Sequence, residues 1–103
     1  MKQVAPPPLP LPALAAMLDG YFHQDYRYIY VTPVGAARAY AVEAAPEDLL
    51  AAREELALFI AWAESAPRKS WQLAFASLGG AWLPSTLEPM RTVLRALEAA
   101  KPA

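Results

Sequence analysis

Hydrophobic side chains recur along most of the chain at the three- and four-residue spacing of amphipathic helices. Leu11, Leu14 and Leu18 follow this spacing, which predicts a first helix over about residues 11–23. Similar stripes with proline in the first turn predict four more helices. These cover about residues 33–44 and 46–65, a segment opened by Pro67, and a last segment beginning near Thr86. Helices joined by short connections predict an all-α fold, a single-domain bundle of about five helices.

Capping residues mark the ends of these helices. Thr32 before Pro33 is an N-cap followed by proline at the first helical position. Pro46 likewise occupies the first position of the next predicted helix, and the two acidic residues after it complement the helix dipole. Gly79 and Gly80 supply the left-handed stop that ends many helices. The caps therefore agree with the hydrophobic pattern on where the helices lie.

Two segments do not follow a simple amphipathic pattern. Residues 24–31 alternate aromatic and β-branched side chains, but no second strand offers itself as a partner, so we expect an extended connection packed by its tyrosines. Residues 56–63 are apolar on every side of their helix. A helix of this kind is central or is covered by a partner. We therefore expect the 46–65 helix to be the centre of the bundle.

Composition limits the chemistry of the chain. Its 103 residues contain no cysteine and one histidine, which excludes a Cys/His zinc site, a thiol nucleophile and a disulfide framework. With a net charge of −1, the chain lacks the excess of basic residues that is typical of nucleic-acid-binding proteins. No apolar run is long enough to cross a membrane. We expect one cytoplasmic domain over residues 11–103, preceded by a proline-rich leader over residues 1–10, with no cofactor, no direct nucleic-acid partner and no membrane partner.

The histidine is the first candidate for chemistry. His23 and Asp25 could form an acid–base pair, but no nucleophile motif or second histidine accompanies them. The structural alternative is that their side chains close the end of the first helix. Trp62, Trp71 and Trp82 are expected in the core. We therefore expect a protein that is not an enzyme.

Charged side chains offer candidate binding surfaces. The carboxylates gather around the junction of two predicted helices and continue one to two turns beyond it, at Glu43, Glu47, Asp48, Glu54 and Glu55. They lack the Glu-x-x-His signature of di-iron bundles. They are either a solvated surface or a docking patch. The opposite candidate is the face of the last helix that carries Arg91 and Arg95.

A short string after the first helix resembles a known family. The string is followed by an aromatic residue and consists of Tyr21, Phe22, His23, Gln24 and Asp25. It resembles the signature of one family of immunity proteins of contact-dependent growth inhibition systems, the CdiI type. The supporting layout, which extends the resemblance from Leu11 to Leu97, comprises Glu54-Glu55-Leu56, Leu78-Gly79 and Trp82-Leu83-Pro84.

This resemblance implies a small cytoplasmic bacterial protein encoded beside a large cell-surface delivery protein. It would bind the C-terminal toxin domain of that protein and block it. Such toxin domains are commonly nucleases, whose basic substrate face acidic side chains can occupy. The resemblance therefore favours the acidic patch as the toxin-binding site and the 21–25 string as scaffold. Two alternatives stay open, a helical adaptor or oligomerisation module and an enzyme at His23 and Asp25, and the oligomeric state is not fixed by the sequence.

Overall fold

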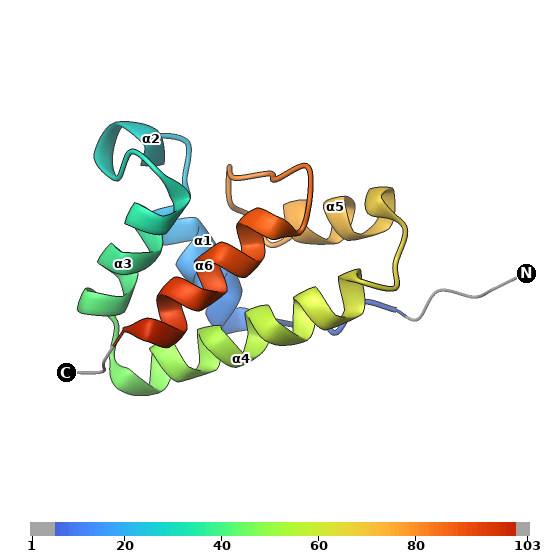
Figure 1. The fold of residues 1–103 in the computed structure, drawn as a ribbon, viewed down its shortest axis with the longest axis horizontal. Helices are drawn as coiled ribbons and strands as arrows, with labels where there is room; N and C mark the ends of the chain where they lie inside the picture. Colours follow the sequence, from blue (N-terminus) through green and yellow to red (C-terminus); the bar gives the residue numbers. More distant parts are fainter. Residues whose placement is uncertain (1–5, 101–103) are drawn as a thin grey trace, which may run out of the picture.

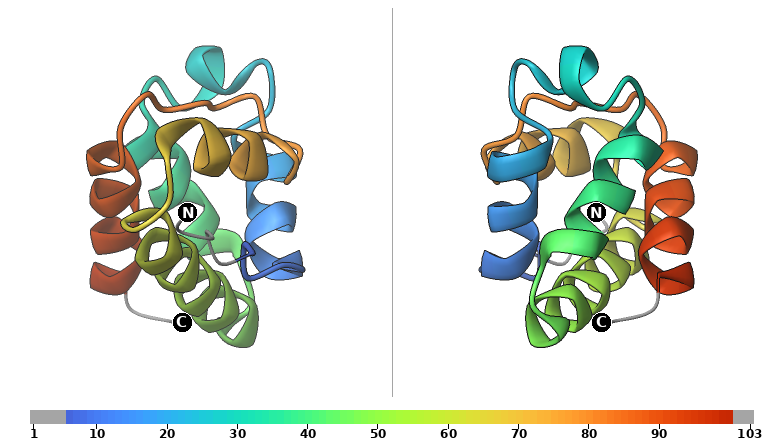
Figure 2. Two further views of the ribbon diagram at one scale, coloured as in Figure 1. Left: turned by 90° about the vertical axis from the view of Figure 1, so that its right-hand side faces the viewer. Right: turned by 90° about the vertical axis from the view of Figure 1, so that its left-hand side faces the viewer.

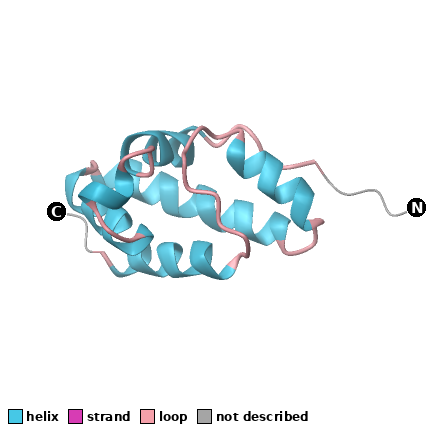
Figure 3. Ribbon diagram, turned by 90° about the horizontal axis from the view of Figure 1, so that it is seen from above, coloured by secondary structure: helices cyan, strands magenta, loops and turns pink. Residues whose placement is uncertain are grey.

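The computed structural model describes residues 6–100, and all the regular structure in this range is helical. Figure 3 shows the described chain as helices joined by loops. The helices are α1 (Pro12–Tyr21), α2 (Tyr26–Ile29), α3 (Pro33–Glu43), α4 (Pro46–Ala63), α5 (Arg68–Ala76) and α6 (Glu88–Ala99). The predicted all-α bundle is confirmed, with one short helix more than the hydrophobic pattern indicated.

The predicted caps set the helix boundaries. α1, α3 and α4 each begin with proline, at a position where a missing amide costs no hydrogen bond. The Thr32 hydroxyl accepts a hydrogen bond from the Gly35 amide at 3.0 Å. Beyond α5, Gly79 has a φ of 105°, which a residue without a Cβ adopts readily. The N-cap of α3 and the left-handed stop after α5 are therefore confirmed.

The connection after α1 differs from the prediction. The alternation of residues 24–31 indicates an extended segment, but Tyr26–Ile29 forms α2, a single helical turn. The Tyr28 amide donates a hydrogen bond of 3.0 Å to the Asp25 carbonyl. The turn therefore satisfies backbone groups that an unpaired strand would leave without hydrogen-bond partners. The Tyr28 side chain is 89% exposed. The expected tyrosine packing is therefore wrong for Tyr28, although the Tyr30 ring stacks on Tyr21 with centroids 5.7 Å apart.

α4 lies along one side of the bundle, and α1 and α6 pack onto it. In Figure 1 it runs below α1, α3 and α6, and Figure 2 shows α1 and α6 on opposite sides above it. α3 packs against α6 and α1. α5 lies over the C-terminal half of α4, where the rings of Phe59 and Phe75 are 5.3 Å apart. The long helix therefore does not lie at the centre of the bundle as expected: it packs against α1 and α6, and one face of it points away from the bundle.

The core is built from apolar side chains. Among the described residues the buried set contains no charged side chain. Trp71 and Trp82 are 4% and 7% exposed and belong to the core, as expected, whereas Trp62 is only partly buried at its edge. No helix within residues 6–100 has both the length and the apolar character that a bilayer crossing needs.

Candidate functional site

The 21–25 motif connects the end of α1 to the loop before α6. The Phe22 side chain is fully buried and stacks on the Trp82 ring with centroids 5.0 Å apart. The Phe22 carbonyl accepts a hydrogen bond from the Ala81 amide at 2.8 Å. The Trp82 ring in turn meets the edge of Phe75 at 5.7 Å. Phe22 therefore holds the 80–85 loop against α1 and α5.

Tyr21 connects the motif to the end of α3. Its hydroxyl donates a hydrogen bond of 2.6 Å to Oε2 of Glu43, and its ring packs edge-on against Tyr40 at 5.3 Å. The hydrogen bond to the Glu43 carboxylate, aided by burial and by the negative charge of that group, raises the pKa of Tyr21 to about 12. Tyr21 is therefore a neutral hydrogen-bond donor at physiological pH.

His23 and Asp25 are not arranged as an acid–base pair. The imidazole Nδ1 of His23 accepts a hydrogen bond of 3.1 Å from the backbone amide of Asp25, while the Asp25 and Gln24 side chains are exposed. A catalytic dyad would instead have the carboxylate orient the ring by accepting its N–H. The geometry gives His23 a part in closing the turn after α1. Among residues 6–100, no group of three His, Asp or Glu side chains could hold a metal ion.

The structure divides the five candidate acidic residues into two groups. Glu43 accepts the hydrogen bond from Tyr21. Oε1 of Glu55 accepts a hydrogen bond of 3.0 Å from the backbone amide of Leu14, one of the first amides of α1, which have no partner inside the helix. These two carboxylates therefore hold α1 against α3 and α4.

The other acidic side chains, Glu47, Asp48 and Glu54, point outward from α4 and are exposed. Glu47 and Glu54 are seven residues apart, so they share one face of the helix. Leu50 and Leu58 lie on the same side and are 50% and 55% exposed. The amphipathic pattern of the 46–65 helix did not mark these leucines as exposed. The signal for Leu58 was present, because it lies in the stretch that is apolar on every side.

The positive charges of Arg91 and Arg95 on α6 are paired with carboxylates of the same chain. Arg91 lies 3.4 Å from Glu64 and 3.3 Å from Glu88, and Arg95 lies 3.3 Å from the other oxygen of Glu88. Hydrogen bonds from Arg95 and Arg91 lower the pKa of the Glu88 carboxyl. This face consequently offers less unpaired positive charge than the sequence indicated.

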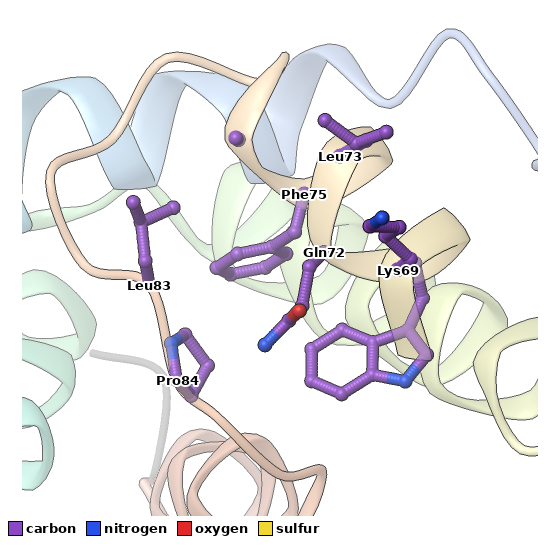
Figure 4. A pocket seen from close by; sticks show the side chains of 8 residues that line it. Lys69, Gln72, Leu73, Phe75, Leu83 and Pro84 are labelled. Atoms are coloured by element: carbon purple, nitrogen blue, oxygen red, sulfur yellow. The ribbon is translucent and has the colours of Figure 1, made fainter. Parts of the chain in front are cut away.

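An apolar groove, the α5 groove, lies between α5 and the 80–85 loop. It has a volume of about 350 Å³ and is lined by side chains that include Lys69, Leu73, Phe75, Leu83 and Pro84. Figure 4 shows Leu83 and Pro84 on one side, Lys69 and Leu73 on the other, and the Phe75 ring between them. Leu73 is 70% and Leu83 is 62% exposed. No local pattern along the chain predicts this groove, because it forms only when the loop folds back beside α5.

Comparison with known proteins identifies the chain at the level of its family. No curated protein and no solved structure matches it. The family model described as CdiI immunity protein matches residues 10–91. The match covers the segment from α1 through the start of α6, and it includes both the 21–25 motif and the loop that Phe22 holds in place. Because this is most of the chain, the protein belongs to the CdiI immunity protein family.

Proposed function

We propose that the protein neutralises the C-terminal toxin domain of a contact-dependent growth inhibition system by binding to it in the bacterial cytoplasm. The observation that carries this proposal is the family match over residues 10–91. Neutralisation by binding requires no catalysis, and the hydrogen bonding of His23 to the Asp25 amide supports a structural role for the candidate acid–base residues.

The proposed toxin is a nuclease. A nuclease presents a basic face to its substrate, and an inhibitor that places carboxylates against this face gains both association rate and selectivity. The exposed carboxylates of Glu47, Asp48 and Glu54 lie along one helix and suit this task. The Glu43 and Glu55 carboxylates already accept intramolecular hydrogen bonds. We therefore narrow the proposed contact from five acidic residues to the three on the outside of α4.

Co-expression with the toxin domain tests the proposal. The probe is the C-terminal domain of the large delivery protein encoded beside this chain. Expressed alone, that domain should stop growth, and co-expression should restore it. The two purified proteins should elute as one complex from a size-exclusion column, and the complex should no longer cleave DNA or RNA.

Three results would contradict parts of this proposal. Failure both to co-elute and to protect would remove the toxin-binding function. Protection without any nuclease activity in the free toxin domain would keep the binding function and reject the nuclease assignment. Chemical modification or degradation of the toxin after incubation with the pure protein would show that the protein has a catalytic activity.

A further inference from the structure

The outward side of α4 carries acidic and apolar side chains in one continuous row. Glu47, Leu50, Glu54 and Leu58 follow one another at intervals of three, four and four residues. This spacing keeps side chains on one face of a helix. All four are exposed, as are Ala57 and Ala61 on the same face. We name this row of six residues the α4 outer face.

The opposite side of α4 makes this face rigid. Its inward row, which includes Leu49, Leu56 and Phe59, is fully buried. α1 and α6 pack against α4, with the Glu55 carboxylate bonded to α1 and Glu64 paired with Arg91 of α6. A surface that is ordered before binding loses less conformational entropy when a partner docks.

We infer that the α4 outer face is the binding site of the toxin domain, with Leu50 and Leu58 as apolar anchors that alternate along the helix with the carboxylates of Glu47 and Glu54. The inference rests on the proposed function and assigns the partner chemistry at that site. The complementary surface of the toxin domain presents lysine or arginine side chains beside apolar ones. The leucine anchors exclude water from the contact, and the carboxylates pair with the basic side chains next to them.

The size of the face suits such a contact. From Glu47 to Ala61 the helix rises by about 21 Å. A specific interface of ordinary size covers about 800 Å² on each partner, so the α4 outer face, about 10 Å wide, forms a central strip of such a patch. The proposed contact also accounts for the apolar stretch over residues 56–63, because the toxin would cover Ala57, Leu58 and Ala61, which the bundle leaves exposed.

Charge distinguishes this face from the α5 groove, which is the competing apolar surface. Lys69 lines the α5 groove (Figure 4), Arg27 lines the adjoining cleft, and no carboxylate lines either of them among the described residues. A basic toxin surface would meet like charge there, which opposes association. On the α4 outer face it meets Glu47 and Glu54, so charge complementarity favours α4.

Paired leucine variants test the anchors. The Leu50→Ala/Leu58→Ala protein is compared with the Leu73→Ala/Leu83→Ala protein, which removes two exposed leucines from the α5 groove. The purified toxin domain described above is the probe, and association and dissociation are measured by surface plasmon resonance. We expect the α4 pair to dissociate at least tenfold faster and the groove pair to stay within about twofold of wild type. Circular dichroism melts verify that both variants fold.

A second pair tests the carboxylates. Glu47→Gln/Glu54→Gln should lower the association rate at low salt, and the difference from wild type should shrink as salt screens the charges. Asp19→Asn/Glu98→Gln, which also removes two exposed carboxylates but from α1 and α6, is the matched control and should leave the rate unchanged.

The outcomes separate this inference from the proposed function. If wild-type protein neither protects nor binds, the proposed function fails and the inference fails with it. If wild-type protein protects and binds but the Leu50→Ala/Leu58→Ala protein dissociates from the toxin at the wild-type rate, the proposed function stands and the α4 outer face is rejected as the binding site. Loss of binding in the Leu73→Ala/Leu83→Ala protein alone would also reject α4 and move the toxin to the α5 groove.

Discussion

The hydrogen bond between Tyr21 and Glu43 gives a sharp prediction about the 21–25 motif. Tyr21→Phe removes the hydroxyl that donates to Glu43 at 2.6 Å and keeps the ring that packs against Tyr30 and Tyr40. Glu43→Ala removes the carboxylate that accepts this hydrogen bond, whereas Glu43→Gln would leave an amide oxygen that can still accept it. The two single variants and the double variant complete a cycle that isolates the interaction of the hydroxyl with the carboxylate.

The expected magnitude follows from the geometry. A hydrogen bond to a charged group contributes about 1.5–3 kcal/mol, but Glu43 is exposed, and solvent weakens exposed charged interactions toward the lower end of the measured range. We therefore expect a coupling of about 1 kcal/mol in the free energy of unfolding. In a domain of this size a loss of about 1 kcal/mol lowers the melting temperature by about 4–8 °C.

The raised pKa of Tyr21 adds a pH dependence of known sign. The ordinary pKa of 10.0 rises to about 12 in the folded protein, so the unfolded chain loses this proton first as pH rises. The hydrogen bond therefore contributes its full stability below pH 10, and the contribution is lost as pH rises from about 10 to about 12. The stability difference between wild type and Tyr21→Phe should shrink over that interval.

Urea unfolding followed by circular dichroism measures both effects. The four proteins of the cycle are compared at pH 7, and wild type and Tyr21→Phe are compared up to pH 11. A coupling below about 0.3 kcal/mol, the ordinary error of additivity, would refute the hydrogen bond as a stabilising contact. Glu43→Gln should also leave the rate of toxin association unchanged, because its carboxylate is engaged within the chain. Slower association of the Glu43→Gln protein would show that Glu43 contacts the toxin.

Three further predictions concern stability and can be measured by the same unfolding assay. Glu55→Ala should cost about 1 kcal/mol because the Leu14 amide loses its partner, whereas Glu54→Ala on the exposed face should stay within about 0.5 kcal/mol; equal effects would refute the capping role. Gly35→Ala should destabilise by about 1–3 kcal/mol because its Cβ would collide with the Tyr30 carbonyl oxygen, whereas Gly20→Ala, with open space around it, should stabilise by about 0.5–1 kcal/mol. Phe22→Ala should cost about 3–5 kcal/mol by opening a cavity beside Trp82, and Tyr28→Ala, at an 89% exposed position, should change little.

The roles of the motif residues depend on their neighbours in space. The resemblance favoured the 21–25 string as scaffold, and the structure gives Phe22 and Tyr21 contacts with distant segments of the chain. His23 makes a hydrogen bond inside its own turn. The side chains of Gln24 and Asp25 are exposed. The string therefore contains buried aromatic contacts at its start and a solvent-facing turn at its end.

The sequence by itself determined the helices and the family. Proline at the first helical position, the Thr32 hydroxyl and a left-handed glycine act on the backbone within a few residues of themselves, so their effects can be predicted without knowledge of the fold. The 21–25 motif identified the family for a similar reason, because a contiguous string can be recognised from sequence alone. The alternating pattern of residues 24–31 gave a wrong prediction of an extended segment. These residues have no partner strand, so a helical turn supplies the hydrogen bonds of their backbone.

The tertiary structure decided which side chains remain available to a partner. Glu55 and Leu14 are separated by 41 residues and Tyr21 and Glu43 by 22 residues, so no local pattern shows that these carboxylates are used inside the molecule. Leu58 is exposed because α1, α5 and α6 cover the other sides of α4. Burial and charge pairing depend on contacts between segments distant in sequence, and hydrophobicity alone does not say which side of an apolar helix its neighbours will cover.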